Sequence, residues 1–448
     1  MISTMKRPPL VDGTPLIGNT LSMARDPAAF FVSCYRQYGP AFRVRVLGRE
    51  QTVIAGPEAA VFMGTAQGRE CLRSKEFWEG LTSEYGAQRT ITGEDGEVHK
   101  QLRSVLRRGY SRQAIEGRYD QVVAITEAAL DRDWKPGAMV PVVPAMQYMV
   151  VDQLGILLTG EAPREYVEDI RLLITVILNV LVTKQRPRAL LWDPRYRHAK
   201  ARVNELGQAM IADRRARALP APEQRTLIDD IMAANVERPD LFPDSDLVLA
   251  LTGPYLAGLD TVANTLAATV YAVLKHPEVL ARVNQEADAL FAGGVVDEKT
   301  LTTTIPAING AISEAMRLYP IAVAQMRTAT QDFEFEGTQI QADELLYVAT
   351  SVPHFMDEFY PDPYRFDIDR YAKPRAEDRA PGAYSPFGRG QHLCLGKSLA
   401  EVQMALTIAT LFHRRVLRLP TPDYTLKTKT APTPGPSRRF AVRVAGRR

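Results

Sequence analysis

An apolar stretch of helical character from about Ser245 to Lys275 limits the fold of this chain more than any other feature. It ends before His276-Pro277, because the residue that precedes a proline disfavours the helical backbone. At about 30 residues the stretch is long for a helix of a globular domain. A helix that is apolar over most of its surface has to be buried on nearly all sides. The sequence therefore predicts a large protein built around one central helix.

The rest of the chain is predicted to be mostly helical. Asp26 can cap a first helix over Pro27–Tyr38, which ends before a Gly-Pro pair. Helical patterns then dominate from about residue 57 to residue 327. A last helix is predicted over about Gly396–Arg415, where apolar residues recur at helical spacing.

Strands are predicted in two places. Residues 42–46 alternate between apolar residues and arginine, which is typical of a strand with one buried face, and residues 52–55 form its return strand. Strand patterns reappear at residues 333–337 and 345–349, before a Pro-rich irregular segment. We expect a single domain over residues 1–448. It is mainly α, with a smaller β-rich portion from about residues 40–60 and the late strands.

Composition excludes several classes of protein. The three cysteines, Cys34, Cys71 and Cys394, form no CxxC pair, which disfavours a disulfide framework or a structural zinc site. A formal net charge of +3 gives no reason to expect nucleic-acid binding. Residues 1–19 contain neither a signal-peptide core nor an apolar run long enough for a membrane anchor. We expect a soluble, cytoplasmic protein with no nucleic-acid partner and no membrane anchor.

The last helix begins after the glycine-rich loop Pro386–Gly396, which contains Cys394. Its glycines allow backbone turns that side chains would block and let the loop lie flat against a planar ligand. The amides of a helix N-terminus favour a thiolate, which is one of the axial ligands of haem iron. Phe387 could shield the sulfur, and His392 could donate to a haem propionate. Taken singly, such a cysteine is more often a buried apolar residue, and such a turn could bind phosphate.

The whole string resembles the cysteine loop of cytochrome P450 enzymes, F-x-x-G-x-[HR]-x-C-x-G, and fills every fixed position. The resemblance implies the cytochrome P450 fold, with haem b buried between the central helix and the cysteine-loop helix. Cys394 would ligate the iron, and the loop residues Phe387, Gly388, His392 and Gly396 would contact the cofactor.

A second motif, Glu314 and Arg317, lies three residues apart in a helical stretch, so that the two side chains share one face. Alone, this spacing predicts only a surface ion pair. Its position before the cysteine resembles the family's E-x-x-R helix, and the resemblance assigns Arg365 as a third, structural partner.

Inside the central helix, Ala257-Gly258-Leu259-Asp260-Thr261 matches the family motif [AG]-G-x-[DE]-T. The resemblance implies that Gly258 opens a notch for dioxygen, that Thr261 hydrogen-bonds to it, and that Asp260 supports proton delivery. The alternative is a helix kink with a back-bonded threonine. Pro254 departs from the family pattern and predicts a kink one turn earlier.

His99 and Arg103 lie four residues apart on a basic helical face, which alone indicates only a solvated surface. The resemblance places them, together with Arg327, at the family's propionate-binding positions. It also implies a basic docking face made by Lys100, Arg107, Arg108, Arg389 and Lys397.

The implied reaction is insertion of one oxygen atom of O2 into a lipophilic small molecule, such as a terpenoid, a steroid, a fatty-acid-like molecule or a secondary metabolite. Electrons would come from a ferredoxin or flavodoxin and its NAD(P)H reductase. Two alternatives remain: a haem peroxygenase or isomerase, and a non-catalytic haem sensor. Neither needs the pair Asp260-Thr261, which is intact here.

Overall fold

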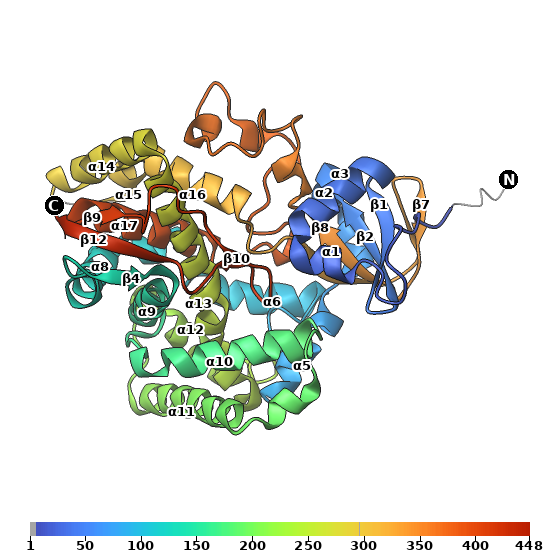
Figure 1. Ribbon diagram of the computed structural model, residues 1–448. Coiled ribbons are helices and arrows are strands. Elements are labelled where there is room, and N and C mark those ends of the chain that lie inside the picture. Colours follow the sequence, from blue (N-terminus) through green and yellow to red (C-terminus); the bar gives the residue numbers. More distant parts are fainter. Residues whose placement is uncertain (1–5, 295) are drawn as a thin grey trace.

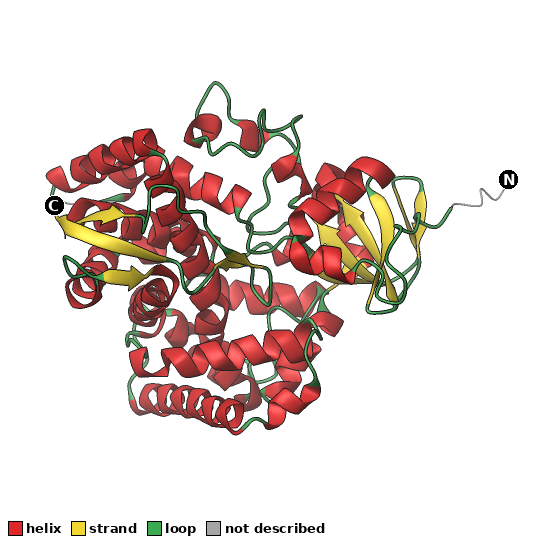
Figure 2. Ribbon diagram, viewed as in Figure 1, coloured by secondary structure: helices red, strands yellow, loops and turns green. Residues whose placement is uncertain are grey.

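The computed structural model describes residues 6–294 and 296–448, arranged as a large helical part and a smaller part that contains a sheet (Figures 1 and 2). The central helix α13 spans Asp244–Lys275, within one residue of the predicted start. Most of its side chains are buried, as its apolar sequence predicted. The helix continues through Pro254 as a single element, so the predicted kink does not break it.

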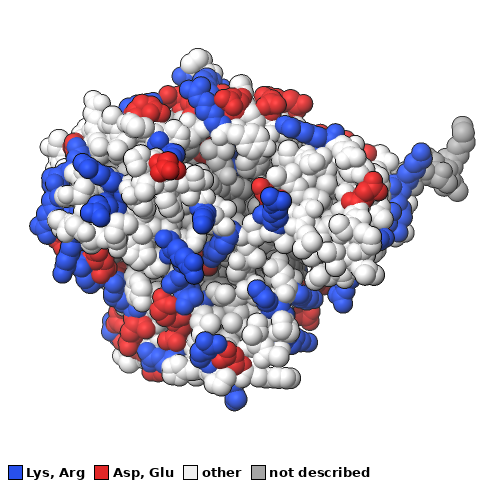
Figure 3. All heavy atoms as spheres, in the orientation of Figure 1, with Lys and Arg blue, Asp and Glu red and all other residues white. Residues whose placement is uncertain are grey.

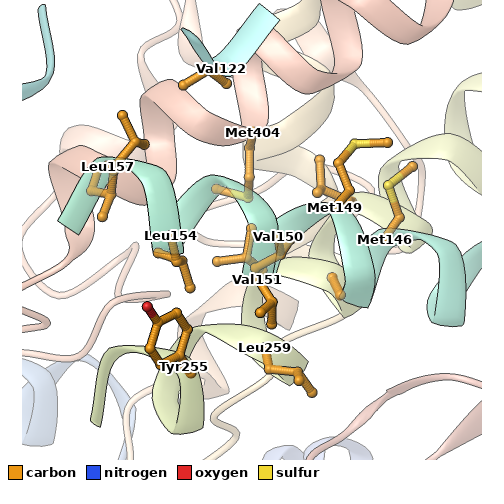
Figure 4. Packing of buried hydrophobic residues seen from close by; sticks show 14 of the residues in the cluster. Val122, Met146, Met149, Val150, Val151, Leu154, Leu157, Tyr255, Leu259 and Met404 are labelled. Atoms are coloured by element: carbon orange, nitrogen blue, oxygen red, sulfur yellow. The ribbon is translucent and has the colours of Figure 1, made fainter. Parts of the chain in front are cut away.

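Helix α9 (Val142–Leu154) packs along α13. Its apolar residues, including Val150, Val151 and Leu154, are directed toward Tyr255 and Leu259 of α13 (Figure 4). Both helices therefore belong to one large apolar core, and this packing fixes the position of α13.

The other helices surround this pair. Next to α13 lie α10 (Val167–Ile177), α11 (Pro194–Ala216), α12 (Leu227–Glu237), α14 (Pro277–Ala292), α16 (Pro306–Leu318) and α17 (Lys397–Arg414). The remaining α-helices are α1 (Thr20–Arg25), α2 (Pro27–Tyr38), α3 (Gly56–Phe62), α4 (Ala66–Cys71), α5 (Lys75–Glu84), α6 (Gly96–Arg107), α7 (Arg112–Glu116), α8 (Tyr119–Asp133) and α15 (Glu298–Thr303). Helix α2 begins and ends as predicted, and the Asp26 carboxylate accepts a hydrogen bond from the amide of Ala29 at 3.0 Å.

The β-rich part is a five-stranded sheet that joins the beginning of the chain to its late strands. Its order is β1 (Ala41–Val46), β2 (Arg49–Ala55), β8 (Leu345–Ala349), β5 (Gln325–Ala329) and β3 (Leu72–Arg73). The predicted alternation holds, because Phe42 and Val44 are fully buried while the arginines between and after them are not. Arg327, one of the predicted cofactor-binding residues, lies on strand β5 of this sheet.

Short strands complete the fold: β6 (Phe333–Phe335) with β7 (Thr338–Ile340), β4 (Met139–Pro141) with β12 (Ala441–Arg447) and β9 (Arg415–Arg418), and β10 (Thr428–Lys429) with β11 (Gly435–Pro436). The Pro-rich segment at residues 360–384 contains only short 3-10 turns, as predicted.

Two segments, Val142–Thr159 and Asp244–Lys275, could cross a membrane by length and composition alone. The most apolar 18-residue stretches of the two are 78% and 83% buried inside the protein, respectively, which is typical of core helices. They give no argument for a membrane span.

Candidate functional site

Glycines set the shape of the loop around Cys394. Gly388 and Gly390 have φ angles of +75° and +73°, a region that other residues rarely adopt. A side chain on Gly390 would also overlap the carbonyl oxygen of Met63. The loop closes when the amide of Cys394 donates to the carbonyl of Phe387 at 2.9 Å. This backbone leaves Cys394 exposed just before α17, whose N-cap is Gly396.

The surroundings of the Cys394 thiol act on its charge in opposite directions. Cys394 exposes part of its surface, yet most of the volume around its sulfur is protein, and this burial raises its pKa. The Gly396 amide, Arg103 and Lys397 each act to lower that pKa. The helix start predicted from the sequence and the nearby cations therefore favour a thiolate. Burial is the larger effect, however, and the net pKa of the thiol is raised.

One face of α13 is open in an otherwise buried helix. Ala257 and Thr261, one turn apart, are exposed, and Gly258 is half-buried. Tyr110 lies against the cysteine loop, because its ring is 3.7 Å from the position that a side chain on Gly396 would take. Helix α17, which follows Cys394, also packs against α13. The helix that begins beside the thiol is therefore packed against the helix that carries the open face.

Two residues of the α13 motif make contacts that modify their predicted roles. The hydroxyl of Thr261 donates to the carbonyl of Ala257 at 2.7 Å, which is the back-bonded arrangement. A side chain on Gly258 would approach Leu154 of α9 to 2.6 Å. The space left by the missing side chain of Gly258 is thus filled by Leu154. The glycine therefore allows close helix packing on this side, and the predicted dioxygen notch stays a prediction.

Asp260 lies in a buried polar network that the sequence did not indicate. Its carboxylate accepts a hydrogen bond from Gln147 of α9 at 2.5 Å and lies 3.9 Å from the ammonium of Lys429 on β10. The half-exposed guanidinium of Arg438 donates to the side-chain amide oxygen of Gln147 at 2.6 Å. Asp260 is therefore connected to the surface through one amide, on a side of α13 different from that of Thr261.

Four basic residues gather beside the cysteine loop. The rings of His99 and His392 lie 4.4 Å apart, Arg103 interacts with Cys394, and Arg327 is buried. Burial lowers the pKa of His99 to about 4 and that of Arg327 to about 10. Arg327 donates only to neutral acceptors, and the buried Nε2 of His99 has no hydrogen-bond partner among the described residues. Such a group of buried, under-compensated donors fits an anionic ligand such as a pair of haem propionates.

Asp95 is the carboxylate within this basic group. Its oxygens accept hydrogen bonds from His392 at 2.8 Å, from Gln391 at 3.0 Å and from the amide of Ser74 at 2.9 Å. Burial raises the pKa of Asp95, but these hydrogen bonds outweigh it and the net shift is downward. His392 thus uses its Nε2 within the protein, which leaves Nδ1 for any added ligand.

The predicted pair of Glu314 and Arg317 is present, but its third partner is Arg370, not Arg365. Arg317 donates two hydrogen bonds to Glu314, at 2.8 and 2.7 Å, and Arg370 donates a third at 3.1 Å. All three side chains are fully buried. Arg365 is exposed, and it contributes only its carbonyl oxygen to the two guanidinium groups.

This triad reaches the cysteine loop through His354. Arg317 donates to the carbonyl of His354, and the Nε2 of His354 accepts a hydrogen bond from the amide of Ser385 at 3.1 Å. Ser385 in turn accepts a hydrogen bond from Arg389 at 2.8 Å. The triad therefore positions the segment that leads to Cys394.

The five residues of the predicted docking face differ in their surroundings. Arg108 pairs with Asp230 at 2.6 Å, and Arg389 is bound to Ser385 and to a backbone carbonyl. The guanidinium groups of both arginines are therefore bound within the protein. Lys100, Arg107 and Lys397 remain exposed to solvent.

Known proteins resemble this chain over nearly its whole length. The family model for cytochrome P450 matches residues 8–431. Cyclooctat-9-en-7-ol 5-monooxygenase from Streptomyces melanosporofaciens is 26% identical and is aligned over 92% of this chain and 89% of its own. Sterol 14alpha-demethylase from Mycolicibacterium vanbaalenii is 30% identical over 48% of both chains. The solved structure of retinoic acid-bound cyanobacterial CYP120A1 has a TM-score of 0.82 and 24% identity, with coverage of 98% of this chain and 99% of that one.

Proposed function

The chain belongs to the cytochrome P450 family and is a monooxygenase, and we propose that it holds haem b through Cys394 and oxidises a lipophilic small molecule. The observation that carries this proposal is the exposed thiol of Cys394 just before α17, a helix that packs against α13 with its open face. Beside them lie the buried Arg327 and the unpaired Nε2 of His99, donors without full compensation that suit an anionic, planar ligand. A haem-binding sensor needs the thiol and the donors beside it, but it does not need the open face of α13.

The haem would lie between the cysteine loop and α13. Cys394 would ligate the iron, with Phe387, Gly388 and Gly396 against the proximal side and Ala257 on the distal side. His99, Arg103, Arg327 and the Nδ1 of His392 would hold the propionates. When bound, the cofactor supplies the reductive activation of dioxygen, and the protein supplies position, ligand and protons.

Thr261 and Asp260 would deliver protons in sequence. The Thr261 hydroxyl lies on the open face of α13, where it can release the Ala257 carbonyl and hydrogen-bond to a substrate-side oxygen or water. Asp260 is held by Gln147 and Lys429, and it would exchange protons with solvent on the side of Arg438. This surface connection supports a monooxygenase over a peroxygenase, because only oxygen activation consumes protons from solvent.

We propose that electrons reach the cofactor from a ferredoxin or flavodoxin and its NAD(P)H reductase in the cytoplasm. The docking face would be the proximal surface with Lys100, Arg107 and Lys397, whose charges face solvent. Complementary charge mainly raises the association rate and is screened by salt.

The substrate would be lipophilic, because residues 77–92 and 172–191, which by the family resemblance would line the pocket, are mostly apolar. Phe77, Trp78 and Ile91 pack against the large core from one such segment, and Leu178 and Leu191 do so from another. A terpenoid or a steroid is consistent with relatives named for a cyclooctat-9-en-7-ol and a sterol. Fatty-acid-like molecules and other secondary metabolites belong to the same class.

The deciding experiment is substrate-dependent NAD(P)H consumption by the haem-loaded enzyme with a surrogate ferredoxin and reductase. Lipophilic ligands would first be screened for a shift of the haem spectrum from low to high spin. A monooxygenase consumes NAD(P)H and O2 and forms a hydroxylated product. A peroxygenase forms product from peroxide without NAD(P)H, and a sensor shifts its spectrum without forming product. Either of the last two results would contradict the proposal.

A further inference from the structure

A narrow stripe of unburied residues runs along the middle of α13. Over residues 246–273 every residue of this helix is buried except Ala250, Gly253, Ala257, Gly258 and Thr261. Gly258 lies against Leu154 of α9. The other four, which we call the open stripe, are three or four residues apart and therefore share one face of the helix. Tyr255 and Leu259 are directed toward α9 instead (Figure 4), so the open stripe lies on a different side of α13.

The proline inside α13 leaves one backbone acceptor of the open stripe without its helical partner. In an α-helix the carbonyl of Ala250 would accept a hydrogen bond from the amide four residues later. That residue is Pro254, which has no N–H group, and its ring pushes the Ala250 carbonyl away from the helix axis. The helix nevertheless continues through this position as one element. The carbonyl oxygen of Ala250 therefore lacks its usual hydrogen bond and lies on the face of the open stripe.

The side chains of the protein do not satisfy this oxygen. Thr252, which carries a hydroxyl in the same turn, donates it to the carbonyl of Val248 at 2.7 Å. Within the described chain no side chain donates to the carbonyl of Ala250. A side chain added at Gly253, the neighbouring residue of the open stripe, would meet no atom within 4 Å, so there is space beside the carbonyl. A backbone acceptor in such a position costs free energy unless a bound molecule or water supplies a donor.

We propose that the carbonyl oxygen of Ala250 binds a hydroxyl group of the substrate. A carbonyl oxygen only accepts hydrogen bonds, so it selects a molecule with a donor. The four residues of the open stripe are uncharged, and the buried Asp260 lies on another side of α13. A charged ammonium group would therefore lose its hydration here without gaining a counter-charge. Charged side chains of both signs are spread over the visible outer surface instead (Figure 3). The stripe thus favours a neutral alcohol over an amine.

The position of this oxygen also sets the distance between the hydroxyl group and the carbon that is oxidised. The inference rests on the proposed function, in which Ala257 lies on the distal side of the haem. Ala250 precedes Ala257 by two turns of the helix, which is about 10 Å along its axis. A short alcohol reaches only one of these two places, whereas a larger lipophilic alcohol reaches both. The substrate class is thereby narrowed to lipophilic alcohols whose hydroxyl group lies about 10 Å from the oxidised carbon.

The test is a spectral titration of the haem-loaded, full-length protein with matched ligands. The probes are terpenoid and steroid alcohols, each with its deoxy analogue and its methyl ether, and the dissociation constant is read from the shift from low to high spin. The alcohol that binds most tightly should bind about fivefold more tightly than its deoxy analogue, which corresponds to one hydrogen bond between neutral groups. Its methyl ether, which has an acceptor but no donor, should bind no more tightly than the deoxy analogue.

The variant Pro254→Ala supplies the missing N–H group, so the carbonyl of Ala250 regains its hydrogen bond within the helix. Alanine is the better helix former, so the variant should fold and bind haem. We expect its affinity for the alcohol to fall about fivefold, to that of the deoxy analogue, whose own affinity should not change.

Two matched controls leave Pro254 in place. Thr252→Val changes a buried side chain in the same turn of α13, and Pro277→Ala removes an exposed proline from the first turn of α14, where an amide has no helical partner. Both controls should keep the fivefold preference for the alcohol.

The results that would overturn the proposal are distinct from those that would overturn the proposed function. Equal binding of the alcohol and its deoxy analogue by the parent would refute the role of the Ala250 carbonyl and leave the monooxygenase assignment intact. A preference that survives in Pro254→Ala, or that is lost equally in the controls, would refute it as well. Absence of a spin-state shift with every ligand would contradict the proposed lipophilic substrate itself, and the present proposal would fall with it.

Discussion

Arg370 replaces Arg365, the partner predicted from the sequence, in the buried triad with Glu314 and Arg317. Its guanidinium is fully buried and donates to Glu314 at 3.1 Å, to Glu377 at 2.8 Å and to the carbonyls of Pro361 and Asp362, both at 2.8 Å. Replacement by methionine keeps much of the apolar volume but removes every one of these hydrogen bonds. The Glu314 carboxylate would then be compensated by Arg317 alone.

The expected cost follows from the burial of this pair. Breaking a buried ion pair by removing one partner costs about 3–5 kcal/mol of unfolding free energy, because the other charge remains buried. For a chain of 448 residues, each kcal/mol lowers Tm by about 1 °C. We therefore expect Arg370→Met to lower Tm by about 3–5 °C. Because the triad reaches Ser385 through His354, the variant should also lose haem more readily.

The matched control is Arg365→Met, which changes the arginine that the sequence motif had indicated. Arg365 is exposed and uses only its backbone in the triad, so its replacement should change the unfolding free energy by less than about 0.5 kcal/mol. Thermal unfolding and the rate of haem transfer to apomyoglobin measure both variants. If Arg365→Met were the more damaging change, the assignment of Arg370 to the triad would be refuted.

Three further predictions concern catalysis by the haem-loaded enzyme. Thr261→Ala should keep haem and substrate binding but lower the ratio of product formed to NAD(P)H consumed, with added peroxide release; an unchanged ratio would exclude Thr261 from the proton path. Gln147→Leu removes the hydrogen bond that holds Asp260, so it should raise the solvent isotope effect on turnover and leave the spin-state titration unchanged, whereas an unaltered isotope effect would assign Gln147 to packing only. The double reversal Arg107→Glu/Lys397→Glu should slow reduction by an acidic ferredoxin most at low ionic strength, and equal rates there would refute the docking face.

Elements with a local signal could be predicted from the sequence. The Asp26 cap and the following Gly39-Pro40 mark both ends of α2, and the alternation of Phe42 and Val44 marks β1. The length and apolar character of α13 predicted its central position. In each case the determining forces act within a few residues of the chain, so the pattern and the structure agree.

Contacts between distant segments could not be predicted in this way. Arg365 and Arg370 lie five residues apart in an irregular segment, and no periodicity there indicates which side chain turns inward. Asp260 meets Gln147 and Lys429, which lie more than a hundred residues away on either side and belong to no motif. Such pairings depend on how helices and strands pack.

The same reason explains why the contact between Gly258 and Leu154 could not be predicted. A glycine within a helix indicates a close approach, but the sequence cannot indicate whether the approaching group is a ligand or a neighbouring helix. Here the neighbour is Leu154 of α9. The role of Asp95 was not predicted, because an acidic residue is common at the N-terminus of any helix. Its contact with His392, almost 300 residues later, forms only in the folded chain.

The measurement that tests the central claim most directly is the absorption spectrum of the reduced, carbon monoxide-bound enzyme, for the parent and for Cys394→Ala. The account predicts the strongly red-shifted Soret band of thiolate ligation in the parent and in the control Cys71→Ala, whose thiol is buried in the core beside the sheet. It predicts loss of that band in Cys394→Ala. A red-shifted band that survives in Cys394→Ala would show that another residue ligates the haem, and the proposed site would be wrong.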